Sequence, residues 1–245
     1  SGLPAGRELE ILEEYRGRLP GEVFTTAYEP PATDGSGQIR ANLRSAKQLL
    51  EKAGWHINGG VLTHAESGEI MEIEFLLSTS SWERIVSPMI GNLERLGVKA
   101  TVRTVDRTQY QNRIQEFDYD MISLVRGQSH SPGNEQRNYW TREAAEEAGG
   151  GNFAGVVDPV IDELVDRLVQ APDRAELVAV TRALDRVLLW GHYVIPHWYS
   201  STFNVVHWDK FGKPEMSAPY TSDYFVMPYT WWYDEEKAAH LNESK

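Results

Sequence analysis

Hydrophobic residues recur every three or four positions in several stretches of the chain, the spacing of helices that bury one face. One such stretch, 39–53, ends before Gly54, a residue typical of helix C-termini. Two more begin after Asp158 and Asp173, whose side chains suit the N-cap position. The pattern predicts a helix in each of these stretches.

Strand-like and helix-like patterns alternate in the middle of the chain. Alternating apolar residues in 71–77 and a β-branched run in 98–105 flank a helical stretch that Gly97 ends. A short helix after Asp106 and an apolar strand, 119–125, follow. Strands that alternate with helices usually pair in parallel through right-handed crossovers, so this order predicts an α/β fold with a βαβαβ parallel core.

Further strands are expected on both sides of this core. Val61 and Leu62, with a polar turn at 66–69, are predicted to form a hairpin with the 71–77 strand. Beyond the last long helix, the sequence predicts strands around 193–199 and 203–208, one of them returning antiparallel to the sheet.

Aromatic residues gather near one end, where 14 of the chain's 26 lie between Trp190 and Tyr233. The stretch 220–233 has too little periodicity to bury its own rings, and each enclosed ring covers roughly 150–250 Å². The segment is therefore expected to pack on another surface.

Charge and composition exclude several classes of function. With 24 basic and 36 acidic residues the net charge is −12, a poor match to nucleic acid, whose phosphates are bound by clustered Lys and Arg. The absence of cysteine excludes disulfides and thiolate zinc sites, but leaves the compartment open. No signal peptide is recognisable at the first residues, so a mature chain, a cytosolic chain or an internal fragment is expected.

No metal, cofactor or catalytic site is predicted. His192 and His197 are separated by an odd number of residues, which places them on opposite faces of a strand, and no carboxylate completes a site with His207. The chain lacks a Gly-x-Ser-x-Gly turn, and its adjacent carboxylates resemble a solvated face, so no enzyme is predicted. The run Gly149–Gly151 lacks the Lys-Ser/Thr ending of a phosphate loop and is expected to be a flexible loop.

The loop that follows the 119–125 strand carries the strongest binding signal. It combines hydrogen-bond donors, acceptors, both charges and aromatic rings, a mixture that suits a polar molecule with an amide backbone. The candidate ligand-binding residues are Arg126, Gln128, Ser129, His130, Asn134, Glu135, Arg137, Tyr139 and Trp140. An ordinary surface loop is the alternative on this pattern alone.

Several motifs, in order, resemble the C-terminal part of the family 5 extracellular solute-binding proteins, the receptors of ABC importers. These motifs are Ala46–Trp55, Glu74–Val105, Phe117–Met121, Asn152–Gly155 with Val157–Leu164, Arg174–Leu189 and Val194–Pro196. The runs Gly127–Ser129 and Ser131–Arg137, and the opening Gly2–Pro4 with Glu8–Glu13, resemble the Yej-type branch, which is associated with peptide and microcin C uptake in Gram-negative bacteria.

The resemblance implies a type II periplasmic-binding-protein lobe and a chain that lacks the N-terminal lobe. Residues 1–38 would be an irregular covering segment, 39–204 the ligand-clamping lobe, and 205–245 an aromatic-rich tail that returns toward the missing lobe. Ligand would bind between lobes that close by a hinge motion. The implied partners are a peptide or peptide-like ligand, the missing lobe and an ABC permease in the inner membrane, and the implied location is periplasmic or otherwise extracytoplasmic.

The sequence departs from the family at one position of the loop. Dipeptide-type receptors place an Asp where this chain has Gln128, so the same anchoring of a peptide N-terminus does not follow, and Glu135 is the candidate substitute. The alternative function is a sensor or interaction domain of a regulatory protein built on the same lobe. In a receptor fragment, some of Tyr224, Phe225, Trp231 and Trp232 are expected to be unusually exposed or packed on a neighbouring molecule.

Overall fold

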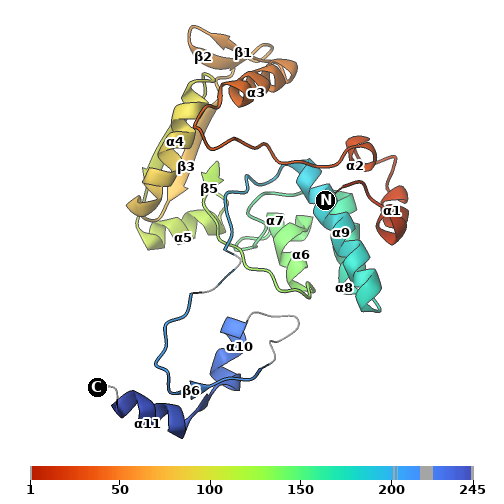
Figure 1. Ribbon diagram of the computed structural model, residues 1–245. Coiled ribbons are helices and arrows are strands. Elements are labelled where there is room, and N and C mark those ends of the chain that lie inside the picture. Colours follow the sequence, from red (N-terminus) through yellow and green to blue (C-terminus); the bar gives the residue numbers. More distant parts are fainter. Residues whose placement is uncertain (1, 201, 203, 216–222, 244–245) are drawn as a thin grey trace. The chain divides into compact units, whose positions relative to one another are not determined.

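The computed structural model describes residues 2–200, 202, 204–215 and 223–243 (Figure 1). Contacts divide the chain into a first unit, Ser1–Val125 with Glu135–Tyr193, and a second unit, Arg126–Asn134 with Val194–Lys245. Among the helices formed by the described residues, none has both the length and the apolar character needed to cross a membrane.

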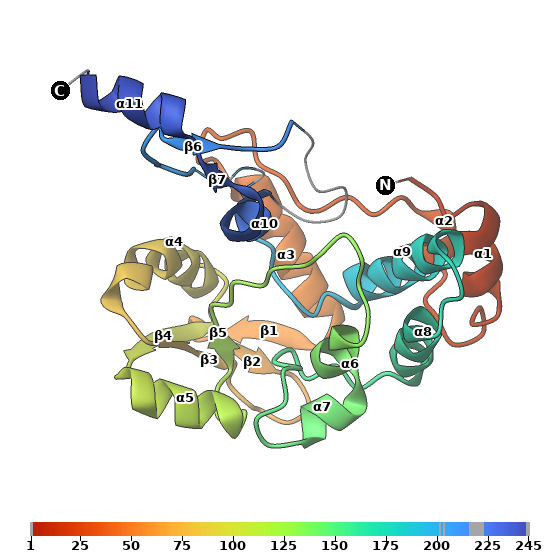
Figure 2. The same cartoon turned by 90° about the horizontal axis from the view of Figure 1, so that it is seen from below.

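The first unit contains a three-stranded parallel sheet. Across the sheet its strands are β4 (Lys99–Thr104), β3 (Glu72–Leu77) and β5 (Met121–Ile122). A 3₁₀ turn, η1 (Ser80–Trp82), and helix α4 (Glu83–Glu94) connect β3 to β4, and α5 (Arg107–Gln115) connects β4 to β5. The two helices cover opposite faces of the sheet (Figure 2). The predicted βαβαβ parallel core is confirmed.

Local chemistry explains where these elements begin and end. One oxygen of Asp106 accepts hydrogen bonds from the backbone N of Thr108 and Gln109, both at 2.9 Å, and so caps α5. Gly97 follows α4 with a φ of +84°, and a Cβ there would lie 2.9 Å from the backbone N of Leu62. Only glycine meets both conditions without strain.

The hairpin differs from its prediction. Strand β2 (Val61–His64) pairs antiparallel with β1 (Trp55–Asn58), which follows helix α3 (Arg40–Lys52). Between β2 and the chain leading to β3 there is a single antiparallel bridge, from Thr63 to Ile70. Both edges of β3 are occupied by β4 and β5, so β2 pairs with β1 instead.

The helical part of the first unit packs around α8 (Pro159–Val169) and α9 (Arg174–Gly191), which lie side by side (Figure 1). Asp158 and Asp173 cap them as predicted, accepting from the backbone N of Val160 and Glu176. The segment 1–38 contributes α1 (Gly6–Glu13) and α2 (Glu22–Thr25) to the same core. Fully buried side chains of this core include Ile11, Leu12, Val23, Ile161, Leu164, Val165 and Val180.

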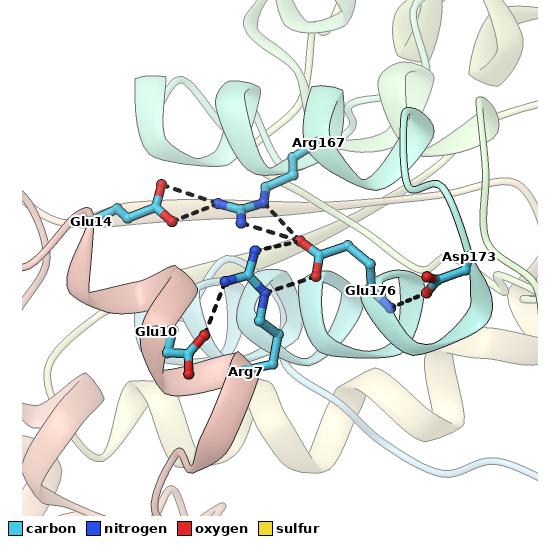
Figure 3. Close-up of polar contacts among 6 residues, drawn as sticks. All are labelled: Arg7, Glu10, Glu14, Arg167, Asp173 and Glu176. Carbon is cyan, nitrogen blue, oxygen red and sulfur yellow. Dashed lines mark hydrogen bonds and ion pairs between the residues drawn. The ribbon is translucent and has the colours of Figure 1, made fainter.

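Ion pairs join α1 to α8 and α9 on the surface of this core. Figure 3 shows Glu176 between the guanidinium groups of Arg7 and Arg167, with Glu10 and Glu14 as their outer partners. Hydrogen bonds from Arg7, and then from Arg167, hold the pKa of the Glu176 carboxyl below its ordinary value of 4.5. The network therefore stabilises the fold at pH values above 4.5, the ordinary pKa of the group. This contribution is lost as the pH falls through the lowered pKa of Glu176.

A buried ion pair ties the beginning of the chain to α9. Arg186 and Glu8 are 8% and 9% exposed, and Nε of Arg186 lies 2.7 Å from Oε1 of Glu8. Nη1 of Arg186 also donates to the backbone O of Gly2 at 2.9 Å. Charges this deeply buried depend on each other for stabilisation.

The second unit holds short elements and many aromatic side chains. Its elements are the antiparallel pair β6 (Phe211–Gly212) and β7 (Trp232–Tyr233), with helices α10 (Asp223–Thr230) and α11 (Glu235–Glu243). Trp232 is 52% exposed, Trp231 is half-buried, and the side chains of Tyr224 and Phe225 lie outside the described residues. The tail thus leaves at least one of the four rings named from the sequence open to solvent.

The strands predicted at the end of the lobe are not formed. Residues 193–200 and the described part of 203–208 have no regular structure. Val194, Ile195, Trp198 and Tyr199 are all exposed. Aromatic and β-branched residues favour strands only where a neighbouring strand and a buried face receive them, and the described residues offer this segment neither.

Candidate functional site

The predicted ligand-binding segment, Arg126–Trp140, is divided between the two units. Its first part, Arg126–Asn134, belongs to the second unit and has no regular structure before α6 (Glu135–Trp140) begins. Arg126 is half-buried. The other candidates in this part are exposed: Gln128, Ser129, His130 and Asn134. These side chains present polar groups to solvent, as a recognition surface requires.

Short local hydrogen bonds shape this first part. The Ser129 hydroxyl donates to the backbone O of Ser131 at 3.0 Å and accepts from its backbone N at 3.2 Å. Serine hydroxyls commonly stabilise turns in this way. The turn bends the backbone between Gln128 and Pro132, a proline that also restricts the residue before it.

The second part of the segment is anchored in the first unit. The indole N of Trp140 donates to Gln136, which is 6% exposed, at 3.1 Å, and the Trp140 ring packs on the core around α8. The guanidinium of Arg137 pairs with Asp166 of α8. Arg137 and Trp140 therefore use polar groups within the fold, while the Glu135 and Tyr139 side chains are exposed and half-buried, respectively.

Helix α8 also fixes the chain just beyond α6. A carboxylate oxygen of Asp162 accepts from the backbone N of Arg142 at 2.9 Å, at the start of helix α7 (Arg142–Glu146). Asp162 and Asp166 are four residues apart, so they lie on the same side of α8. One face of α8 thus holds both α6 and α7.

The loop 149–156 packs against these helices instead of forming the expected flexible loop. Gly150 and Gly151 are buried, and a Cβ on Gly150 would lie 2.0 Å from the backbone O of Ala144. The backbone N of Gly151 donates to Oδ1 of Asn138 at 3.0 Å. The glycines permit close contact with α6 and α7, and the run is no open cradle for a phosphate.

Asn152 is the buried polar centre of this loop, with 0% exposure. Its Nδ2 donates to the backbone O of Thr141 at 2.9 Å and of Val156 at 2.8 Å, and its Oδ1 accepts from the backbone N of Val156 at 3.0 Å. The sequence marks Asn152 only as part of a family motif. The following Gly155 and the apolar setting were the available signals for a buried loop-closing Asn.

A second polar cluster lies where β5 begins. Arg113 of α5 donates to Asp118 at 2.8 Å and to Glu74 of β3 at 3.1 Å, beside an open depression of about 460 Å³. Burial opposes ionisation of Glu74, but hydrogen bonds from Arg103 and Arg113 outweigh it and hold the pKa of this carboxyl below its ordinary value. Asp120 accepts from the backbone N of Glu74 at 2.8 Å. This cluster fixes β5 against β3.

The histidines lie in separate surroundings. His192 ends α9 with a φ of +53°, His197 stacks on Trp198, and His207 meets the edge of Trp231 with ring centroids 4.8 Å apart. Within the described ranges, no three His, Asp or Glu side chains gather closely enough to hold a metal ion.

The parallel sheet and its covering helices form an α/β fold. In such folds, ligands usually bind at loops that follow the carboxyl ends of the strands, and the polar segment after β5 is such a loop. An oligopeptide-binding protein of an oligopeptide ABC transporter from Thermotoga maritima has a similar fold, with a TM-score of 0.57 over 79% of this chain and 33% of that chain. The two sequences are 20% identical, so this likeness concerns the fold alone. The chain therefore has the fold of a type II periplasmic-binding-protein lobe.

Sequence comparison gives the family. Residues 13–147 match the model of the bacterial extracellular solute-binding proteins, family 5, middle region, and the chain belongs to this family. It is 45% identical over 241 residues to protein y4wM of Sinorhizobium fredii, covering 98% of this chain and 36% of that protein. It is 42% identical over 232 residues to the probable peptide-binding protein YejA of Agrobacterium fabrum, covering 95% of this chain and 37% of that protein.

Proposed function

We propose that this chain is part of the substrate-binding component of an ABC importer, and that it binds peptides or peptide-like compounds. The observation that carries the proposal is a set of exposed polar side chains, Gln128, Ser129, His130 and Asn134, in the segment that follows β5 along the sequence in a chain of the family 5 solute-binding proteins. Membership of an extracellular family supports a periplasmic location, and an ABC permease in the inner membrane is the proposed partner.

The chemistry of the segment suits an extended peptide. Amide side chains such as Gln128 and Asn134 both donate and accept, which matches the alternating N–H and C=O groups of a peptide backbone. Arg126 supplies a cation for a carboxylate, and Glu135 supplies an anion for an ammonium group. Because Arg137 and Trp140 are used within the fold, we assign them to the support of the surface.

The second part of the proposal concerns the aromatic-rich tail, residues 205–245. The chain spans 36% to 39% of the length of the curated relatives it matches. We propose that residues 39–204 form the ligand-clamping lobe and that 205–245 pack on another lobe of a longer protein. The exposed rings of Trp208, Trp232 and Tyr233 support this assignment, because burying an aromatic ring against another surface is favourable.

Isothermal calorimetry tests the proposal with the complete product of the gene that encodes this chain and, separately, with residues 1–245. The probe is a pool of alanine-based peptides of defined lengths, with an oligosaccharide as control. We expect the complete protein to bind a peptide of the pool and residues 1–245 to bind it weakly or not at all. Equal tight binding by both would contradict the two-lobe account, and no peptide binding by the complete protein would remove the ligand assignment.

A further inference from the structure

Residues Arg126–Asn134, called the recognition segment from here on, are joined along the sequence to two elements of the first unit, which we call their stems. The first stem is β5, which the segment follows, and the second is α6, into which it leads. β5 is only two residues long and pairs with β3 at Phe75 and Leu76. Helix α6 is held by α8 through Arg137 and Asp166. These contacts fix each stem to its own neighbour, but they do not set the spacing between the stems.

The loop 149–156 contacts both stems. The hydroxyl of Tyr119, two residues before β5, donates to the backbone O of Phe153 at 2.9 Å. The adjacent Asn152 donates to the backbone O of Thr141, immediately after α6. Asn138 within α6 accepts from the backbone N of Gly151. Hydrogen bonds to one loop therefore link the residues just before β5 to α6 and to the residue that follows it.

The loop is built to be rigid. Asn152 is fully buried and closes the loop on Val156, whose side chain is also fully buried. A Cβ on Gly150 would lie 2.0 Å from the backbone O of Ala144, and a Cβ on Gly151 would lie 2.5 Å from Nδ2 of Asn138, so the loop packs closely on both helices. The backbone N of Gly149 donates to the backbone O of Gln115 at the end of α5. A loop whose central amide is hydrogen-bonded on both atoms and whose backbone is closely packed transmits position instead of absorbing it.

We propose that the loop 149–156 is a positioning clasp: Tyr119, Asn138 and Asn152 together set the spacing of β5 and α6, and thereby the affinity of the recognition segment for its ligand. This inference rests on the proposed function. None of the three residues needs to touch the ligand, so they are positioning residues. Burial raises the pKa of Tyr119 to about 12, so its hydroxyl remains a donor at physiological pH.

The test uses one mild variant at each stem, Tyr119→Phe and Asn138→Ala, in the complete gene product. The control is Tyr110→Phe on α5, which removes the same atom from another half-buried tyrosine. The readouts are the Kd for the tightest-binding peptide of the alanine-based pool, the thermal midpoint, and amide hydrogen exchange of 126–141 without ligand.

We expect each clasp variant to raise the Kd about three- to tenfold, the range set by one neutral hydrogen bond. We also expect faster exchange in 126–141 and a thermal midpoint lower by about 2–4 °C, the cost of one hydrogen bond in a chain of this size. Tyr110→Phe should leave the Kd within about twofold. A purely structural role would lower the midpoint and leave the Kd of the folded protein unchanged, and that outcome overturns the clasp.

Failure of the clasp and failure of the proposed function give different results. If the unchanged protein binds no peptide of the pool, the proposed function fails. Hydrogen exchange in the ligand-free protein then tests the clasp independently of ligand binding. Exchange in 126–141 that is the same in Tyr119→Phe, Asn138→Ala and the unchanged protein would overturn it, whereas faster exchange confined to the two clasp variants would support it.

Discussion

Replacing Arg186 by methionine is expected to lower the free energy of unfolding by about 3–5 kcal/mol, the usual cost of removing one partner of a buried ion pair. The substitution leaves Glu8 with its carboxylate buried and without its guanidinium partner, and it removes the hydrogen bond to Gly2. Both effects detach the start of the chain from α9. Urea denaturation followed by circular dichroism measures the change.

Two further variants separate the ion pair from the general effect of removing a charge. The double variant Glu8→Leu with Arg186→Met should recover most of the loss, since apolar pairs often replace buried ion pairs at little cost. Lys99→Met removes a partner of the exposed pair with Glu72 and should change stability by at most about 1 kcal/mol. A loss in Arg186→Met no larger than that in Lys99→Met would contradict the buried-pair account.

Asn152→Ala is the second substitution with a large expected effect, a loss of about 3 kcal/mol. It leaves the backbone O of Thr141 and both backbone polar groups of Val156 without the Asn152 amide, in a place that water does not reach. Each unsatisfied buried group costs about 1–3 kcal/mol. For a chain of this size we expect the thermal midpoint to fall by roughly 6–12 °C.

The matched control is Asn42→Ala. The Asn42 amide also donates to a backbone O, that of Ala32, but at 3.3 Å on the surface. Water replaces such a bond, so the midpoint should change by only about 1–2 °C. Equal shifts in the two variants would show that burial of Asn152 contributes nothing.

The sequence predicts elements whose signals are local. Amphipathic periodicity and the caps Asp158 and Asp173 indicate α8 and α9, and the alternation of strands with helices indicates the parallel core. Strands in 193–199 and 203–208 would need a partner strand, and the propensity of the residues does not show whether one is present. The same reason explains why β2 pairs with the short β1 and not with β3.

The sequence names Arg126–Trp140 as the candidate ligand-binding segment, and this stays a prediction. The division of the segment into exposed side chains and side chains anchored in the fold could not be predicted. Arg137 pairs with Asp166 at a separation of 29 residues, and Tyr119 reaches Phe153 across 34 residues. Such contacts follow from tertiary packing. From sequence alone, an arginine that faces a ligand and an arginine that anchors a helix are equivalent.

The central claim is that a peptide binds against residues 126–134. Amide hydrogen exchange of the complete gene product, measured with and without a saturating peptide of the alanine-based pool, tests it most directly. We predict slower exchange in 126–134 when peptide is bound, while exchange in α1, which packs in the helical core of the first unit, stays the same. Bound peptide with unchanged exchange in 126–134, and protection only elsewhere in the protein, would contradict the account.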